Sequence, residues 1–534
     1  MSKWKPDQIM DYITIAIAIL VVIVAAILYT KNVSYTYWKR KGVPYIEPEF
    51  YYGNMKNAIR GETSVAEEFR RYYNELKNRG EKHGGLYNLL TPIYLPIDAD
   101  LLKRILQTDF DHFVNRGTYM NEKDDPLSAH LFNLEGERWK YLRSKLTPTF
   151  TSDTSILGKM KMMFQTLVTC SDGLEEILRE HSKLQDAVDI KDVLGRFTTD
   201  IIGSCAFGIE CNSLRDPNSE FRNIGRETVT PTLSKLMLGF LLLIFPKKIL
   251  QLVGMKSHSN KVISFFRKIV KETIDYREKN NVFRKDFMHL LLQLKNSGKV
   301  NDEDNEIQEI GSGGSSLTVN EIMAQCYVFF LAGFETSSTT MTFALYELAL
   351  HQDIQNKLRE EIRAVLKKHD NKITYESVMD MPYLEKVINE TLRKHPPGQA
   401  IPRVCNKDYP VPGTNVVIER GTQVVIPILA LHRDPEYYPD PEVFDPERFT
   451  EENKAKRPAS TFIPFGDGPR ICIGLRFGML QSKVGLVRIL GNYQVTINNK
   501  TKLPIKIHPR AFIRTVEGDI WLNVTKCDRD KKSG

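Results

Sequence analysis

A single cysteine in a glycine-rich loop constrains this chain more than any other feature. The loop runs from Phe465 to Gly474 and reads Phe-Gly-Asp-Gly-Pro-Arg-Ile-Cys-Ile-Gly. A helical pattern follows at once, so Cys472 lies at a helix N-terminus, whose partial positive charge favours a thiolate. A thiolate presented in this way can bind haem iron as its axial ligand. A buried structural thiol in a tight turn is the alternative.

The neighbours of Cys472 favour the haem ligand over the structural thiol. Gly466 and Gly468 allow the backbone to pass close to a flat ring, where a side chain would collide with it. Arg470 can form a charge-assisted pair with a haem propionate. Gly474 allows the next helix to begin directly beneath the ring.

This loop resembles the signature of the cytochrome P-450 family, Phe-x-x-Gly-x-x-x-Cys-x-Gly, and matches it completely. The resemblance implies a fold that is mainly α-helical with small β-sheets (α+β), in a single large domain. It also implies haem b (iron protoporphyrin IX) as the cofactor. Cys472 would be the metal ligand, with Phe465, Gly466, Arg470 and Gly474 beside the ring.

A long uninterrupted helix is predicted from residue 318 to about residue 350. Thr318 and Glu321 match a capping box, and no proline follows over that length. Residues 327–334 are apolar on every side, which predicts a path through the core. A second membrane span is the alternative, but the uncharged run of residues 322–334 is short for one.

Ala332-Gly333-Phe334-Glu335-Thr336 is an unusual sequence for the inside of a helix. Gly333 costs about 1 kcal/mol relative to alanine there, and a buried glutamate is costly without a partner. The pentapeptide resembles the oxygen-binding helix of the same family. The resemblance implies room for dioxygen at Ala332 and Gly333, and proton delivery by Thr336 and Glu335. For Thr336 alone, a hydrogen bond back to a helix carbonyl is the alternative.

Glu390 and Arg393 lie three residues apart on a predicted helix, as in an ordinary surface ion pair. With Arg448 they resemble the family's Glu-Arg-Arg triad. The resemblance implies a buried structural network behind the haem loop.

Trp139 and Arg143 lie one helical turn apart, so both can donate hydrogen bonds to a haem propionate. The family has a Trp-x-x-x-Arg helix at this point of the chain, and Arg403 is expected to be a further propionate contact. A routine amphipathic helix is the alternative for the first pair.

An apolar N-terminal segment predicts a membrane anchor. Residues 12–29 carry no charge and just reach the length that crosses a bilayer, although a cleaved signal peptide is the alternative. We therefore divide the chain into an anchor (1–30), a basic, proline-containing hinge (31–50) and a haem-thiolate monooxygenase domain (51–534). The flanking aromatic residues are expected at the membrane interface: Trp4, Tyr29, Tyr35, Tyr37 and Trp38.

Basic residues place the main part of the chain in the cytosol. Lys31, Lys39, Arg40 and Lys41 follow the apolar segment, whereas Lys3 and Lys5 precede it. The sequence is most like insect microsomal, detoxication-type members of the family, which implies the endoplasmic reticulum membrane with a cytosolic catalytic domain. A second uncharged stretch, residues 237–245, is either a buried helix or a loop that dips into the bilayer.

Charge and cysteine content exclude other classes. The net charge of +8, from 74 basic and 66 acidic residues, is small for 534 residues and does not suggest nucleic-acid binding. The seven cysteines are odd in number and form no Cys-x-x-Cys pair, which predicts reduced thiols. No Rossmann glycine fingerprint is present, so NADPH is not expected to bind this chain.

The remaining chain alternates helical stretches with short strand-like runs. Most strands are expected in residues 414–428 and 493–524. Residues 302–316, acidic and then rich in glycine and serine, are expected to form a solvated loop.

The resemblance implies a monooxygenase that inserts one atom of dioxygen into a lipophilic small molecule, either a xenobiotic or an endogenous lipid or hormone. Electrons would come from NADPH through a separate flavoprotein reductase, with cytochrome b5 as an optional second donor. A basic docking face is expected from Lys140, Lys145, Arg476 and Lys483. Two alternatives remain open: a peroxide-rearranging isomerase on the same scaffold, and a non-enzymatic haem sensor or carrier.

Overall fold

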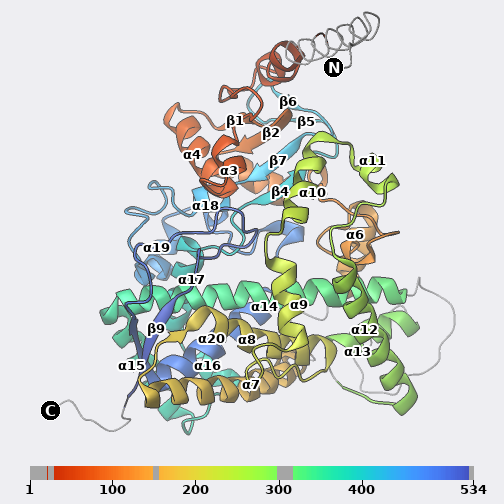
Figure 1. Ribbon diagram of the computed structural model, residues 1–534. Coiled ribbons are helices and arrows are strands. Elements are labelled where there is room, and N and C mark those ends of the chain that lie inside the picture. Colours follow the sequence, from red (N-terminus) through yellow and green to blue (C-terminus); the bar gives the residue numbers. More distant parts are fainter. Residues whose placement is uncertain (1–20, 22–28, 148–155, 285, 298–316, 528–534) are drawn as a thin grey trace, which may run out of the picture.

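The computed structural model of the chain describes residues 21, 29–147, 156–284, 286–297 and 317–527. Helices make up most of this part, as predicted (Figure 1). They are α2 Tyr37–Arg40, α3 Lys56–Arg60, α4 Val65–Asn78, α5 Ala99–Lys103, α6 Gly136–Leu146, α7 Ile156–Leu184, α8 Ile190–Ile202, α9 Glu220–Val229, α10 Leu233–Ile244, α11 Lys247–Leu252, α12 Asn260–Asn280, α13 Phe287–Ser297, α14 Val319–Leu350, α15 Gln352–Lys368, α16 Tyr375–Met379, α17 Pro382–Lys394, α18 Ile428–Leu431, α19 Glu451–Ala455 and α20 Leu475–Asn492. The strands are β1 His83–Asn88, β2 Thr91–Pro96, β3 Val188–Asp189, β4 Ile401–Val404, β5 Tyr409–Pro410, β6 Val417–Ile418, β7 Gln423–Ile426, β8 Tyr493–Ile497 and β9 Trp521–Lys526.

The strands form small sheets, the largest of which has the order β1-β2-β7-β4. β1 and β2 are an antiparallel hairpin, β2 pairs with β7 in parallel, and β4 runs antiparallel to β7 with Arg403 opposite Val424. The other sheets have the orders β3-β9-β8 and β5-β6. Strands β6 to β9 confirm the two stretches where strands are predicted, whereas the sequence did not indicate the β1–β2 hairpin.

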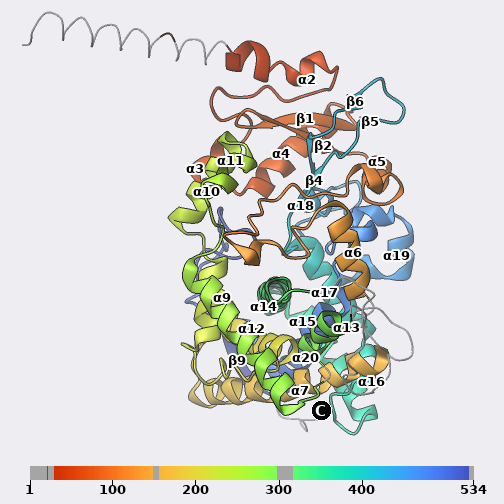
Figure 2. The same cartoon turned by 90° about the vertical axis from the view of Figure 1, so that its right-hand side faces the viewer.

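α14 begins and ends where the sequence predicts. Thr318 is its N-cap: its hydroxyl accepts a hydrogen bond from the backbone N–H of Glu321, whose carboxylate accepts one from the N–H of Thr318. This reciprocal capping box fixes the start of the helix locally. α14 crosses the molecule in Figure 1 and is seen end-on near its centre in Figure 2. Residues 337–349 are buried on every side, so α14 passes through the core there, whereas much of residues 327–334, the part predicted to run through the core, is partly accessible.

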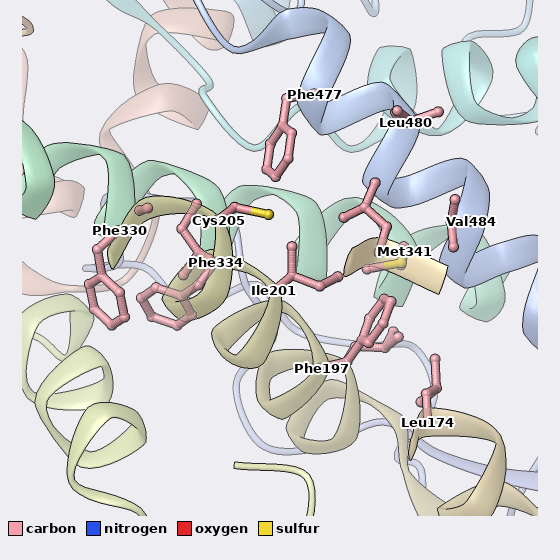
Figure 3. Packing of buried hydrophobic residues seen from close by; sticks show 14 of the residues in the cluster. Leu174, Phe197, Ile201, Cys205, Phe330, Phe334, Met341, Phe477, Leu480 and Val484 are labelled. Atoms are coloured by element: carbon pink, nitrogen blue, oxygen red, sulfur yellow. The ribbon is translucent and has the colours of Figure 1, made fainter. Parts of the chain in front are cut away.

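Three helices meet around Met341 of α14, as Figure 3 shows. Phe197 and Ile201 of α8 and Val484 of α20 pack there. Gly485 of α20 makes this close approach possible, because an added Cβ would overlap the sulfur of Met341. Packing of this density holds α14 rigidly between its neighbours.

The first described residues pack into the body of the protein. Trp38 of α2 is only 1% exposed, and its Nε1 donates a hydrogen bond to the carbonyl of Leu86 at 2.9 Å. Gly85 of β1 leaves room for the indole, since an added Cβ would overlap it. Tyr35 is buried in the same cluster. The interfacial positions predicted for Tyr35 and Trp38 are therefore wrong, and from Tyr35 onward the expected hinge is packed against the sheet.

Within the described residues, no helix has both the length and the apolar character needed to cross a bilayer. The predicted anchor falls almost entirely on residues 1–20 and 22–28, which lie outside the described part of the chain. The predicted solvated loop at residues 302–316 lies outside it as well.

Candidate active site

One side of α14 is accessible in the middle of the molecule. Residues 328–333 are all apolar, yet among them only Phe330 is fully buried, and Ala332 is exposed. Thr336 lies one helical turn further along the same side and is partly accessible. The helix is packed on all sides from residue 337 onward, so the accessible stretch is confined to the part before it.

The cysteine loop is closed by its own backbone. The N–H of Cys472 donates to the carbonyl of Phe465 at 2.9 Å, and that of Gly466 to the carbonyl of Ile463 at 2.9 Å. Gly468 has φ +68°, and an added Cβ would overlap the carbonyl oxygen of Leu106. Gly468 therefore allows contact with residues 104–108, not the close approach to a ring that the sequence suggested.

The Cys472 thiol has accessible surface although protein surrounds it. Burial raises the pKa of Cys472, while the backbone N–H of Gly474 and the guanidinium groups of Arg143 and Arg116 act in the opposite direction. The expectation that the helix N-terminus alone favours a thiolate is thus too simple, because burial outweighs it. A thiolate here requires a cationic partner such as a metal ion.

Four arginine side chains gather near this thiol: Arg116, Arg143, Arg403 and Arg470. Burial is the largest cause lowering the pKa of each, and it lowers that of Arg403 to about 10 and that of Arg470 to about 9. Neighbouring guanidinium groups lower the pKa of Arg116 and Arg470 further. Within the described residues, none of the four has a carboxylate at ion-pair distance, and three leave a buried Nε without a partner.

Arg470 is held by groups that leave its charge uncompensated. Its guanidinium lies 4.2 Å from the centre of the Trp139 ring, in a cation–π contact. Its terminal nitrogens donate to the carbonyls of Phe132 at 3.2 Å and Leu134 at 2.6 Å. These neutral partners fix the orientation of Arg470, and its charge remains available to an anionic ligand.

Arg116 is the residue of this cluster that sequence reasoning missed. It donates to the carbonyl of Phe132 at 3.2 Å and stacks 3.6 Å from the centre of the Phe132 ring. It stands in a loop, between Asn115 and Gly117, with no periodicity or motif around it. Only the folded chain brings it beside the helix α6 that carries Trp139 and Arg143.

The donor set fits a haem group. An unpaired cluster of buried guanidinium groups is unfavourable unless an anion neutralises it, and a haem carries two carboxylates. The accessible thiol beside them is a suitable axial ligand for iron. Among the described residues, apart from the chain neighbours of Gly474, no atom lies within 4 Å of a Cβ built on Gly474, so space is open beside its backbone.

The two predicted proton donors point in different directions. The Thr336 hydroxyl donates to the carbonyl of Ala332 at 2.6 Å, which is the alternative that the sequence left open. Glu335 instead lines a polar cavity together with Lys191 and Arg222, on the side of α14 that faces α8 and α9. Burial raises the pKa of Glu335, and the charges of Arg222 and Lys191 oppose the rise.

Gly333 serves helix packing in this structure. An added Cβ would lie 2.5 Å from Cδ1 of Ile202 on α8, so a larger residue would push α8 away from α14. The expected room for dioxygen therefore depends on Ala332, whose side is accessible, whereas the missing side chain of Gly333 faces Ile202.

The Glu-Arg-Arg residues form the expected buried network. Arg393 donates to both carboxylate oxygens of Glu390 at 2.7 Å, and both side chains are 0% exposed. Arg448 Nε lies 3.5 Å from Oε1 of Glu390. A backbone N–H, that of Asp445, donates to the same oxygen at 2.9 Å. The bidentate pair is thus desolvated and fully engaged.

A chain of hydrogen bonds links this network to the cysteine loop. Arg393 donates to the carbonyl of His432 at 3.0 Å, and the imidazole Nε2 of His432 accepts from the N–H of Ile463 at 3.0 Å. Burial, followed by the charge of Arg393, lowers the pKa of His432 to about 3, so the ring is neutral and can accept. Ile463 begins the turn that leads to Gly466 and Cys472.

The basic face expected for docking loses one member. Lys483 is buried at 3% exposure and pairs with Glu385 at 3.0 Å. Its place on α20 faces α17, so it is not available to a partner protein. Lys140, Lys145 and Arg476 remain candidates.

Comparison with known proteins agrees with this geometry. The sequence model of the family described as Cytochrome P450 matches residues 44–522. The chain is 44% identical to probable cytochrome P450 6a20 of Drosophila melanogaster, over 96% of this chain and 99% of that relative. It is 43% identical to cytochrome P450 6A1 of Musca domestica, over 96% of this chain and 98% of that relative.

These matches extend far beyond the cysteine loop and include the segments that carry the arginine cluster and α14. The reaction class follows from the family, and the chain is an oxidoreductase of the monooxygenase type. The chain belongs to the cytochrome P450 family and shares its haem-thiolate chemistry.

Proposed function

We propose that this monooxygenase oxidises lipophilic small molecules, xenobiotics or endogenous lipids and hormones, with haem b bound through Cys472. The observation that carries the proposal is the cluster of two buried arginines, Arg403 and Arg470, and two partly buried ones, Arg116 and Arg143, beside an accessible thiol. Bound haem would supply the activation of dioxygen, of which one atom enters the substrate and the other leaves as water.

Each part of the site has a proposed task. Cys472 would ligate the iron, and the cysteine loop with Phe465, Gly466 and Gly474 would line the haem site. The haem carboxylates would be held by Arg116, Arg143, Arg403, Arg470 and the indole of Trp139. Ala332 would leave space for dioxygen where α14 is accessible. The triad Glu390, Arg393 and Arg448 supports the loop from behind.

Thr336 and Glu335 are proposed to move protons. While its hydroxyl donates to the Ala332 carbonyl, Thr336 can only accept a hydrogen bond from the site. To donate there, it must exchange that bond for one to a water molecule or to dioxygen. Glu335 retains its proton at higher pH than an exposed glutamate, since burial raises its pKa, and it is placed to take up protons from the polar cavity.

Thr336→Ala is expected to uncouple electron consumption from product formation. The loss of a positioned proton donor lowers turnover by about 100-fold, at the lower end of the usual contribution. Reducing equivalents then appear as hydrogen peroxide, which is measured beside NADPH consumption and product. Thr169→Ala is the matched control, because the Thr169 hydroxyl makes the same kind of bond, to the carbonyl of Gln165 at 3.0 Å, on the exposed surface of α7. Unchanged coupling in Thr336→Ala would remove Thr336 from this role.

The surface of α10 and α11 supports a membrane location. The stretch 237–245 lies mainly in α10, yet the large apolar residues here are exposed: Leu233, Leu236, Met237, Phe240, Phe245, Ile249, Leu252 and Val253. A buried helix is therefore not what this stretch forms, and a patch of this kind favours contact with a lipid surface. We propose attachment to the endoplasmic reticulum membrane, with the catalytic domain in the cytosol.

A separate NADPH-dependent flavoprotein reductase is the proposed electron donor, with cytochrome b5 as an optional second one. The sequence carries no dinucleotide fingerprint, which supports an external source of electrons. Reconstitution of the purified chain with reductase, NADPH and a panel of lipophilic compounds tests the proposal. Substrate consumption is expected only when NADPH and reductase are both present. Turnover of a lipid hydroperoxide without either component would instead establish the isomerase.

A further inference from the structure

Asp125, His258 and Tyr327 form an unbroken buried chain of hydrogen bonds. The imidazole Nδ1 of His258 lies 2.9 Å from Oδ2 of Asp125, and its Nε2 lies 2.8 Å from the hydroxyl of Tyr327. Asp125 is 0% exposed, and Tyr327 is 2% exposed. The three residues come from three different places: a loop before α6, the link between α11 and α12, and α14.

His258 is the side-chain partner that holds Asp125 inside the protein. The carboxylate also accepts backbone hydrogen bonds from Ser257 at 2.9 Å and from His258 itself at 3.2 Å. Among the described residues, no lysine or arginine pairs with Asp125. A buried carboxylate is unfavourable without such partners, so Asp125 keeps its place only while the link carrying His258 stays docked.

Further hydrogen bonds join the same two segments along their length. We call residues 117–128 the roof loop and residues 247–258 the brace. From the brace, Lys247 donates a hydrogen bond to the carbonyl of Gly117, and Gln251 donates to the carbonyl of Met120 at 2.7 Å. From the roof loop, Tyr119 and Asn121 both donate to the carbonyl of Met255, at 2.9 and 3.1 Å respectively. The hydrogen bonds made by Lys247 and Gln251 are exposed to solvent and therefore contribute little stability, whereas those of Asp125 are the most buried.

The roof loop connects the arginine cluster to residues that contact α14. It follows Arg116 directly and ends shortly before Phe132 and Leu134, whose carbonyls accept hydrogen bonds from Arg470. Between them, the N–H of Leu131 donates to Gln325 of α14 at 2.9 Å. In Figure 2 the orange segment that leads to α6 passes above the end-on α14 and reaches the region of α10 and α11.

We propose that Asp125, His258 and Tyr327 act as a latch, which holds the roof loop closed over the site and so sets how fast substrates enter and leave. This inference rests on the proposed function, because it assigns the covered space to a lipophilic substrate. His258 is a positioning residue in this proposal, and it acts only through the loop. Release of the latch leaves the hydrogen bonds of Lys247, Gln251, Tyr119 and Asn121 to hold the roof loop against the brace.

His258→Ala in the haem-loaded, full-length protein tests the latch. Hydrogen–deuterium exchange of the amides in residues 117–128 is expected to rise at least ~10-fold, since the imidazole hydrogen bond to the buried carboxylate is removed and only the backbone N–H groups of residues 257 and 258 still donate to it. The association rate of a lipophilic ligand, followed by the haem absorbance change, is expected to rise by a similar factor, and its dissociation rate with it. His369→Ala is the matched control, because His369 pairs with Asp380 at the surface at 3.3 Å.

Unchanged exchange and unchanged association in His258→Ala would overturn the latch. If that variant does not bind haem, Tyr327→Phe takes its place, because it removes only the hydroxyl contact to His258. It should raise exchange in the roof loop by ~3-fold or more, within the usual range for one neutral hydrogen bond, and a wild-type rate would again overturn the proposal. If instead the wild-type chain showed no haem-thiolate spectrum, the proposed function would fail, while the exchange measurement would still decide the latch.

Discussion

Replacement of Cys472 by alanine is expected to abolish the haem-thiolate spectrum and reduce monooxygenase activity below detection. The thiol is the sulfur atom that faces the arginine cluster, and its accessible surface offers the iron a ligand that alanine lacks. The arginines remain in the variant, so any haem that still binds would do so through its carboxylates. The carbon-monoxide difference spectrum and the haem content measure the two effects separately.

Cys527→Ala is the control for this variant, because Cys527 lies near the C-terminal end of the described chain and far from the arginine cluster. It should leave both the spectrum and the turnover unchanged. A normal thiolate spectrum in Cys472→Ala would refute the ligand assignment, and with it the tasks proposed for the surrounding loop.

Glu390→Ala is expected to reduce the free energy of unfolding by about 3–5 kcal/mol, the usual effect of removing one partner of a buried ion pair. Arg393 would keep its charge at 0% exposure, with only the carbonyls of His432 and Val443 left as acceptors. Because His432 in turn holds Ile463, the cysteine loop should lose order as well. Chemical denaturation reports the stability, and the haem content after purification reports the loop.

Glu451→Ala provides the comparison, since Glu451 is 91% exposed and pairs with Lys454 at the surface. Surface pairs of this kind contribute at most about 1 kcal/mol. If Glu390→Ala were no less stable than Glu451→Ala, the network of Glu390, Arg393 and Arg448 would not have the structural task assigned to it.

Local signals account for what the sequence predicted well. The capping box of Thr318 and Glu321 is a contact between neighbours in the chain, so it fixed the start of α14 without knowledge of the fold. The spacing of Glu390 and Arg393 on one helix likewise implies a pair, although its burial depends on the loop that contains Arg448. Patterns that are complete within one element carry over directly to the structure.

Features that depend on packing between distant segments were not predictable in this way. Helix propensity identified Gly333 as unusual, but its reason is Ile202 on another helix. Arg116 has no motif around it, and Lys483 was expected on the docking face, whereas the fold pairs it with Glu385 of α17. The β1–β2 hairpin was not predicted from the sequence, because its turn contains Leu89, at φ +51°, where glycine or asparagine would be the usual signal.

The position of Trp38 also sets a limit for anyone who shortens the gene to remove the N-terminal segment. Its indole fills the space above Gly85 and donates a hydrogen bond to the carbonyl of Leu86, while its backbone N–H donates to the hydroxyl of Tyr87. A protein that started at residue 51 would lose a buried tryptophan, which typically costs about 3–5 kcal/mol, and would expose one face of β1. A protein that started shortly before Tyr35 would keep the sheet intact, so the useful cut lies at the end of the apolar segment and not at the boundary that composition suggested.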